Sequence, residues 1–196
     1  MNELFDINGL RKYLVPEERE RFASAARTME REVMTFCLTL MNTGCRISEA
    51  LELTPMRFDY PAKCVVIRSL KKRSKTPIYR TIPLSDEFLE DLRLVHDMKK
   101  IQKNKELKNE RIWSWARMTG YRKVMSVMKK AEIEGVHACP KGLRHGFGIH
   151  CALKGIPESR IQKWLGHSSR ESTIIYTDAI GEEERKLASR LWEKND

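Results

Sequence analysis

The sequence lacks any long run of apolar residues. No stretch comes near the roughly 18 apolar residues of a membrane-spanning helix, and the N-terminal stretch MNELFDINGLRKYLVPEERE carries charges where a signal peptide has an apolar segment. These two absences predict a soluble protein of the cytoplasm.

The cysteines and histidines form no pattern that is typical of a disulfide-bonded or metal-bound fold. The five cysteines are an odd number and include no CxxC pair, as expected for reduced thiols in a reducing compartment. The five histidines include no HExxH motif, and no cysteine–histidine spacing matches a zinc site. We therefore expect no disulfide framework and no metal ion.

Positive charge is what the sequence has in excess. The 196 residues include 37 Lys and Arg against 27 Asp and Glu, a formal net charge of +10. Such a balance favours a polyanionic partner, either nucleic acid or anionic lipid. The length fits one domain that can bury a core of its own.

Hydrophobic periodicity predicts a mainly α fold with a small antiparallel β-sheet, in the α+β class. The β-branched stretches CVVIRSL and IYRTIPL predict a hairpin across the basic turn KKRSKTP, and the lysine-rich residues 99–110 predict a solvated loop. Two of the expected helices begin near Pro16 and Ser85. The other expected helices cover about residues 30–42, 47–51, 119–133, 142–153, 157–165, 172–178 and 182–192.

Two of the polar segments have an ordinary structural interpretation when each is taken alone. In TGCRISEA, Arg46 follows a helix-ending glycine and Glu49 lies three residues on, so an ion pair on one helix face is favoured. In KKRSKTPIYR, the cations of a hairpin turn suit either solvent or phosphate contact.

Two further segments place ionisable groups at helix ends. In PKGLRHGFGIH, the spacing puts Lys141 and Arg144 on one helix face, where they repel each other unless an anion lies between them. In LGHSSRESTIIYT, His167 follows Gly166 and alone is typical of a capping residue, while Tyr176 alone is typical of a core tyrosine.

Taken together, these side chains suit nucleophilic attack on a phosphodiester by a side-chain oxygen. Guanidinium groups match the charged oxygens of the transition state with paired donors. An alkoxide leaves poorly, so a protonated group has to give the departing oxygen a proton, and a lysine on the hairpin can do so.

The four segments, in this order, resemble the signature segments of the tyrosine recombinases, the phage integrase family, over about residues 14–176. The resemblance implies the fold of the family's catalytic domain. It also implies site-specific cutting and rejoining of DNA strands through a covalent 3′-phosphotyrosyl intermediate, with no metal, ATP or other cofactor.

The resemblance further implies roles for single residues. Tyr176 is the nucleophile, and Lys75 is the general acid, with Lys71 and Lys72 as competing candidates. The implied catalytic residues are Arg46, Lys75, Lys141, Arg144, His167 and Tyr176, the supporting residues are Glu49 and His145, and the DNA-binding residues are Lys71, Lys72, Arg73 and Arg80.

The sequence departs from the family pattern in two respects. Lys141 stands where the family usually has the histidine of His-x-x-Arg. Its ammonium group can donate to a phosphate oxygen but is a poor base for Tyr176, unless the neighbouring cations favour its neutral form. We also expect a short N-terminal extension, residues 1–15, and a single catalytic domain, residues 16–196, with no N-terminal core-binding domain, as in the short recombinases that invert fimbrial promoter elements.

The expected partners are double-stranded DNA and further copies of the chain, up to a tetramer on DNA. The segment after Tyr176 has an apolar stripe that either packs on its own domain or docks on a neighbouring protomer. Two rival functions remain: a non-catalytic DNA-binding accessory protein or repressor derived from a recombinase, and an activity like that of type IB topoisomerases.

Overall fold

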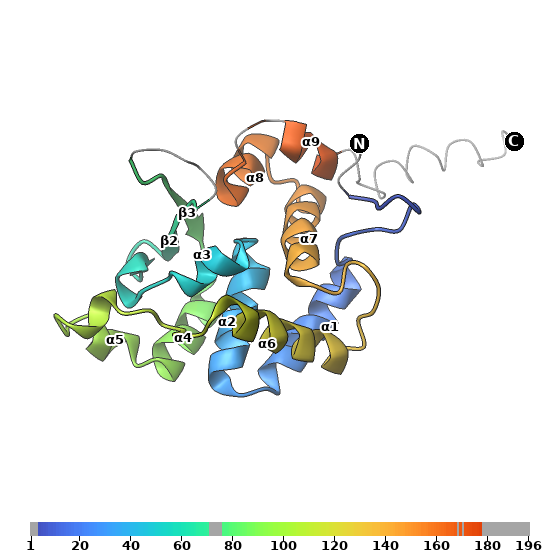
Figure 1. Cartoon of the computed structure of the whole chain (residues 1–196). Helices are drawn as coiled ribbons and strands as arrows, with labels where there is room; N and C mark the ends of the chain where they lie inside the picture. Colours follow the sequence, from blue (N-terminus) through green and yellow to red (C-terminus); the bar gives the residue numbers. More distant parts are fainter. Residues whose placement is uncertain (1–3, 71–75, 168, 170, 178–196) are drawn as a thin grey trace, which may run out of the picture.

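The computed structural model describes residues 4–70, 76–167, 169 and 171–177, and Figure 1 shows the helices arranged around the central helix α2 (Arg31–Thr43). The apolar side chains of α2 are buried on nearly every side, as expected for a helix at the centre of a fold, and its bounds agree with the helix predicted over about residues 30–42. Among the described residues, five helices pack directly against α2: α1 (Pro16–Arg27), α3 (Ile47–Leu51), α4 (Asp86–Val95), α6 (Arg117–Lys130) and α7 (Pro140–Leu153).

A glycine in the left-handed conformation ends α2. Gly44 has φ of 58° and its N–H donates to the carbonyl of Leu40 at 3.0 Å, closing the last turn. A Cβ at this position would come within 2.6 Å of the Phe147 ring. Glycine is therefore required here both by the backbone turn and by the close approach of α7.

The sheet has three antiparallel strands in the order β1 (Phe58–Asp59), β2 (Cys64–Arg68) and β3 (Tyr79–Pro83). Val65 pairs with Ile82, and both are buried against the helices. The predicted hairpin is thus confirmed, while the short strand β1 was not predicted, because two residues are too few to show a period. The turn residues 71–75 lie outside the described residues.

The lysine-rich stretch is more ordered than the solvated loop that the sequence predicts. It contains α5 (Met98–Ile101) and the 3₁₀ turn η2 (Leu107–Asn109). The Met98 side chain is fully buried, and the Gln102 amide donates to the carbonyls of Pro55 and Phe58, at 2.8 Å each. These contacts fix the segment while four of its five lysines stay exposed.

A second, smaller core forms at one end of α7, where α8 (Glu158–Leu165) and α9 (Glu171–Thr177) pack (Figure 1). The buried Leu4 joins this core, so the described part of the predicted N-terminal extension belongs to the same folded body. The members of this core are Leu4, Phe147, Ile149, Cys151, Ala152, Ile161, Leu165 and Tyr176.

The helices after α6 follow the prediction closely. Helix α7 begins at Pro140, two residues before the predicted start, because proline is tolerated in the first helical turn. The predicted helix 182–192 lies outside the described residues. Within the described ranges, no helix is both long and apolar enough to cross a membrane.

Candidate active site

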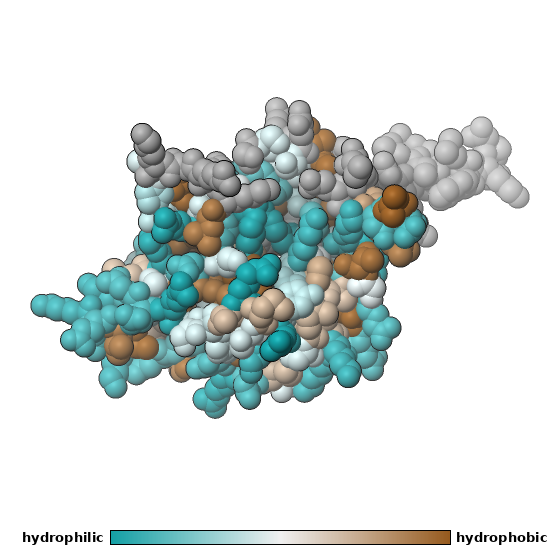
Figure 2. Space-filling view, viewed as in Figure 1, coloured by the Kyte–Doolittle hydropathy of each residue, from teal (hydrophilic) through white to brown (hydrophobic). Residues whose placement is uncertain are grey.

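One pocket of about 800 Å³ lies where α3 (Ile47–Leu51), α6, α7, α9 and the end of α8 meet. In the space-filling view, hydrophilic residues gather on this face between the β2–β3 hairpin and α7 (Figure 2). All the predicted catalytic and supporting residues that the structure describes line this pocket: Arg46, Glu49, Lys141, Arg144, His145, His167 and Tyr176.

Arg46 stands at the start of α3, where Glu49 orients it. Its Nη1 donates to Glu49 Oε1 at 3.0 Å, and its backbone N–H donates to Oε2 at 2.9 Å. The Arg46 side chain keeps 31% exposure, whereas that of Glu49 is fully buried. The predicted ion pair is present, and it presents a partly exposed guanidinium group to the pocket.

Glu49 remains ionised although it is buried. Burial alone would raise the pKa of its carboxyl group, but the hydrogen bond and charge of Arg80, together with Arg46, lower this pKa below its ordinary value. Glu49 therefore holds two arginines at once.

Arg80 faces inward, which corrects the prediction that it contacts DNA. Its Nη2 donates to Glu49 Oε2 at 2.6 Å, and its Nε donates to the Trp164 carbonyl at 2.7 Å. Its Nη1 donates to Ser69 Oγ at 3.1 Å. The alternation of β3 turns this side chain to the buried face, so Arg80 joins the hairpin to α3 and α8.

Arg144 is held between the ends of two helices. Its Nη1 donates to the Gly44 carbonyl at the end of α2, and its Nη2 donates to the Leu165 carbonyl at the end of α8, both at 2.8 Å. Burial and then the charge of Arg46 lower the pKa of Arg144 to about 10, so it is still charged at neutral pH. The carbonyl-rich helix ends stabilise this buried cation.

Tyr176 lies on α9 with its ring against α7. The ring is 1% exposed and packs on Gly148, where a Cβ would come within 2.8 Å of three ring atoms. Its hydroxyl lies 3.0 Å from Nδ1 of His145. The His167 ring stacks beside it, with centroids 6.0 Å apart and an angle of 20° between the planes.

Further contacts fix the two histidines. His167 Nδ1 lies 3.0 Å from Thr173 Oγ1, one turn before Tyr176. Burial, and then the charges of Lys141 and other cations, lower the pKa of His145 to about 3, so its ring is neutral. Both histidines are therefore held in place around the phenol.

The hairpin part of the predicted site is not described. Lys71, Lys72, Arg73 and Lys75 lie outside the described residues, so the proton donor and the DNA contacts predicted there stay predictions.

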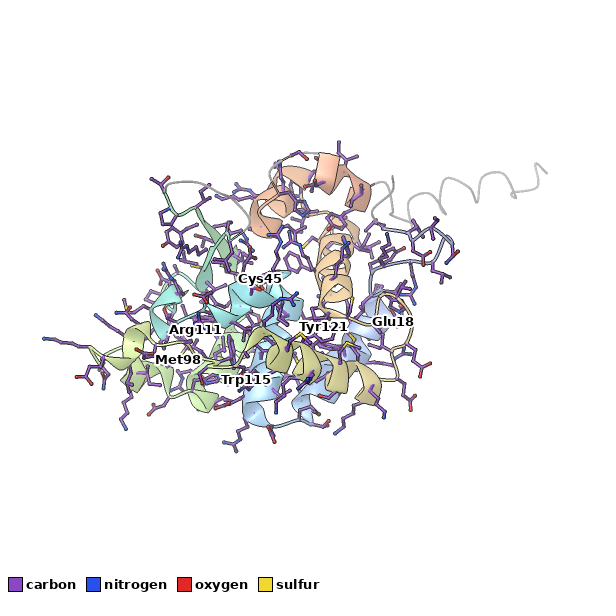
Figure 3. All side chains as sticks on the ribbon, in the orientation of Figure 1. Glu18, Cys45, Met98, Arg111, Trp115 and Tyr121 are labelled. Atoms are coloured by element: carbon purple, nitrogen blue, oxygen red, sulfur yellow. The ribbon has the colours of Figure 1, made fainter. Side chains whose placement is uncertain are left out.

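The pocket also includes residues that the sequence interpretation missed. Arg117 and Tyr121 line it from α6, and Tyr121 is labelled in Figure 3. Their spacing of four residues puts them on one helix face, which was the available signal. A basic residue and a tyrosine at that spacing are too common to indicate a site without the fold.

A sequence model of the phage integrase family matches residues 12–183. A resolvase of Escherichia coli is 29% identical over 193 residues, which cover 86% of this chain and 74% of the resolvase. The type 1 fimbriae regulatory protein FimB of Escherichia coli K12 is 28% identical over 179 residues, which cover 87% of this chain and 86% of FimB.

A solved structure with the same fold is the XerH site-specific recombinase bound to a palindromic difH substrate, in a post-cleavage complex. It has a TM-score of 0.75 and 22% sequence identity to this chain, and the match covers 93% of this chain. The chain spans 54% of the length of that XerH chain.

Proposed function

Because the chain belongs to the phage integrase family of tyrosine recombinases, we propose that it is a site-specific recombinase that cuts and rejoins DNA strands through a covalent 3′-phosphotyrosyl intermediate. The observation that carries the proposal is that Arg46, Arg144, Lys141, two histidines and Tyr176 line one pocket.

A DNA phosphate would be bound mainly by the two arginines. Arg46 offers a partly exposed guanidinium group, and Arg144 uses two of its donors to hold its own position in the pocket wall. As Tyr176 attacks phosphorus, negative charge grows on the non-bridging oxygens, and fixed cationic donors stabilise that charge. Lys141 at the start of α7 and His167 after α8 complete the ring of donors.

The phosphate also explains why so many cations gather at one place. Burial and then repulsion by Arg46 lower the pKa of Arg144, and Lys141 adds a further positive charge at the start of α7. A bound phosphodiester anion would relieve this repulsion. The arrangement is therefore more favourable with DNA than without it.

The leaving 5′-oxygen needs a proton, and the hairpin is where we propose its source. Lys75 is the first candidate and Lys71 and Lys72 are the alternatives, since a shift within the turn would exchange them.

Access to the phenol requires a movement. Tyr176 is 1% exposed, so a backbone phosphate reaches its oxygen only when the groups that cover it on the pocket side move, while α9 stays packed on α7. We propose that DNA binding drives this movement, because the anion adds contacts to Arg46, Arg144 and His167 that the free protein lacks.

Double-stranded DNA and further copies of this chain are the proposed partners. The apolar stripe of residues 178–196, which lie outside the described residues, is the proposed contact between protomers, up to a tetramer. Truncation after Gly181 should then impair recombination more than single-strand cleavage. Equal loss of both activities would indicate that the segment packs within its own protomer.

A second candidate is favoured by the burial of Tyr176: a DNA-binding accessory protein or repressor that no longer cleaves. Both candidates predict salt-dependent DNA binding. They differ with a suicide DNA substrate, whose cleavage releases a short strand and traps the protein. The recombinase gives a covalent adduct that Tyr176→Phe abolishes, and the accessory protein gives none at any plausible site.

A further inference from the structure

The contact between His145 and Tyr176 has a chemical use that the family match does not assign. Nδ1 of His145 lies 3.0 Å from the Tyr176 hydroxyl, within hydrogen-bond distance of the proposed nucleophile. The two rings are tilted at 49° with centroids 5.9 Å apart, so they meet edge to edge through these polar atoms rather than by stacking.

Both atoms are shielded from water. His145 is 4% exposed and Tyr176 is 1% exposed, so solvent does not compete for the hydrogen bond between them. The other ring nitrogen of His145, Nε2, is buried and has no hydrogen-bond partner among the described residues. A buried polar atom without a partner is destabilising, which is typical of a group retained for its chemistry.

The surroundings keep the His145 ring neutral in the free protein. Burial lowers the pKa of His145 to about 3, and nearby cations contribute to the same shift. The groups that contribute lie on three segments: Lys141 and Arg144 on α7, His167 after α8, and Lys12 in the N-terminal segment. A neutral imidazole carries one nitrogen that accepts a proton.

Lys141, while it is charged, does not supply a base for the Tyr176 hydroxyl. An ammonium group has three donors and no acceptor, so Lys141 can bind a phosphate oxygen but cannot take a proton while it is charged. Within the described residues, the imidazole of His145 is the neutral acceptor that lies against the Tyr176 hydroxyl.

We propose that His145 is the catalytic base that takes the phenolic proton of Tyr176 during DNA cleavage, a role that rests on the proposed recombinase function. The O–H bond of Tyr176 breaks and its proton moves to Nδ1 of His145. The phenolic oxygen then bonds to phosphorus, and the bond from phosphorus to the 5′-oxygen breaks. That oxygen leaves with a proton from the hairpin lysine, and rejoining reverses each step.

The same arrangement restricts the reaction to the DNA-bound state. In the free protein the surrounding cations oppose a positive charge on His145. A bound phosphodiester offsets these cations and so favours the imidazolium that forms as the proton moves. The base gains strength only when the substrate is in place, which protects the phenol from activation without DNA.

His145→Asn tests this role, because asparagine keeps a hydrogen-bonding atom near the Nδ1 position but cannot take a proton. The matched control is His150→Asn, which changes a half-buried histidine on the same helix outside the pocket. The substrate carries a bridging 5′-sulfur at the cleavage position. A thiolate leaves without help from an acid, so this substrate isolates activation of the nucleophile.

The expected result is a loss of about 10²–10⁴-fold in the cleavage rate of His145→Asn near neutral pH, the usual contribution of general base catalysis. The loss should shrink at higher pH, where hydroxide takes over removal of the proton. DNA affinity and the rate of His150→Asn should match those of the unaltered protein.

Three results would overturn the role of His145. The first is cleavage by His145→Asn at the rate of the unaltered protein. The second is faster cleavage by this variant, which would show that the contact restrains Tyr176. The third is a loss in cleavage rate that stays the same at every pH. If the unaltered protein forms no adduct, the proposed recombinase function itself fails, which is a different outcome.

A measurement on the unaltered protein removes the dependence on a folded variant. In nitrogen-15 spectra of histidine-labelled protein, the role requires that the proton of neutral His145 sits on Nε2 and that Tyr176→Phe shifts the Nδ1 signal. A proton on Nδ1 would make His145 a donor to Tyr176 and would overturn the proposal.

Discussion

Arg80 and Glu49 form a buried ion pair, with Nη2 of Arg80 2.6 Å from Oε2 of Glu49 and side-chain exposures of 4% and 0%. The pair joins β3 to α3, and Glu49 also orients Arg46. The position of a proposed phosphate-binding arginine therefore depends on a second arginine, which is buried.

Glu49→Gln should destabilise the protein by about 3–5 kcal/mol, because it leaves the buried Arg80 without its counter-charge. Urea unfolding measures the change. The control is Glu52→Gln, which breaks the exposed pair with Arg111 and should cost less than about 1 kcal/mol. Equal costs for the two variants would show that the buried pair is no more important than a surface one.

Methionine variants of Arg46 and Arg144 should differ in their effects on stability. Replacing either by methionine should slow DNA cleavage by about 10²-fold or more, by analogy with loss of an oxyanion-binding donor. Arg144→Met should also destabilise the fold, since each buried carbonyl left unpaired, at Gly44 and Leu165, costs about 1–3 kcal/mol.

Arg46→Met should change stability by less than about 1 kcal/mol, because its side chain is partly exposed. Adduct kinetics and urea unfolding on the same samples give both quantities. Similar stability losses for the two variants would contradict the different packing of these arginines.

Gly148→Ala should displace the nucleophile, because its Cβ would come within 2.8 Å of the Tyr176 ring. We expect a loss of about 1–3 kcal/mol in stability and greater reactivity of Tyr176 toward solvent reagents. In a Tyr176→Ala background the clash is absent, and the same change should be neutral or stabilising, since alanine favours helices by about 0.5–1 kcal/mol. An equal loss of stability in both backgrounds would show that the destabilisation does not come from contact with the Tyr176 ring.

Glu18, labelled in Figure 3, should make stability depend on acid pH. Burial alone would raise the pKa of Glu18, but the hydrogen bond from Arg11, with the contacts from Val15 and His137, lowers it to about 2. A carboxyl whose pKa is lower in the folded state contributes stability above its unfolded value and loses it as pH falls through its folded value.

Between about pH 4.5 and pH 2 the stability of the unaltered protein should therefore fall more steeply than that of Glu18→Gln. Unfolding curves measured from pH 6 to pH 2 check this. Parallel curves would show that the carboxylate of Glu18 does not anchor the N-terminal segment through Arg11.

Local sequence signals were sufficient for much of this fold. The all-round apolar helix α2, the hairpin of β2 and β3 and the glycine-terminated helix ends are each encoded within a short window. The prediction that Arg46, Arg144, His167 and Tyr176 belong to one site came from the order of four segments, and the fold places all of them in one pocket.

The differences arise where distant segments decide the outcome. Arg80 reads as one more cation of a basic hairpin, and only the pairing of β3 with β2 turns it toward Glu49. The contact of Tyr176 with His145 joins two helices 31 residues apart in sequence, so no local pattern reveals it. Met98 likewise anchors a polar stretch through contacts with remote parts of the chain.

The most direct measurement identifies the residue that carries DNA after cleavage. The chain has five tyrosines, and both Tyr121 and Tyr176 line the pocket, so trapping alone does not choose between them. Mass spectrometry of peptides from the adduct formed on a suicide substrate should place the 3′-phosphate on Tyr176. A phosphate on Tyr121, or an adduct that persists in Tyr176→Phe, would contradict this account.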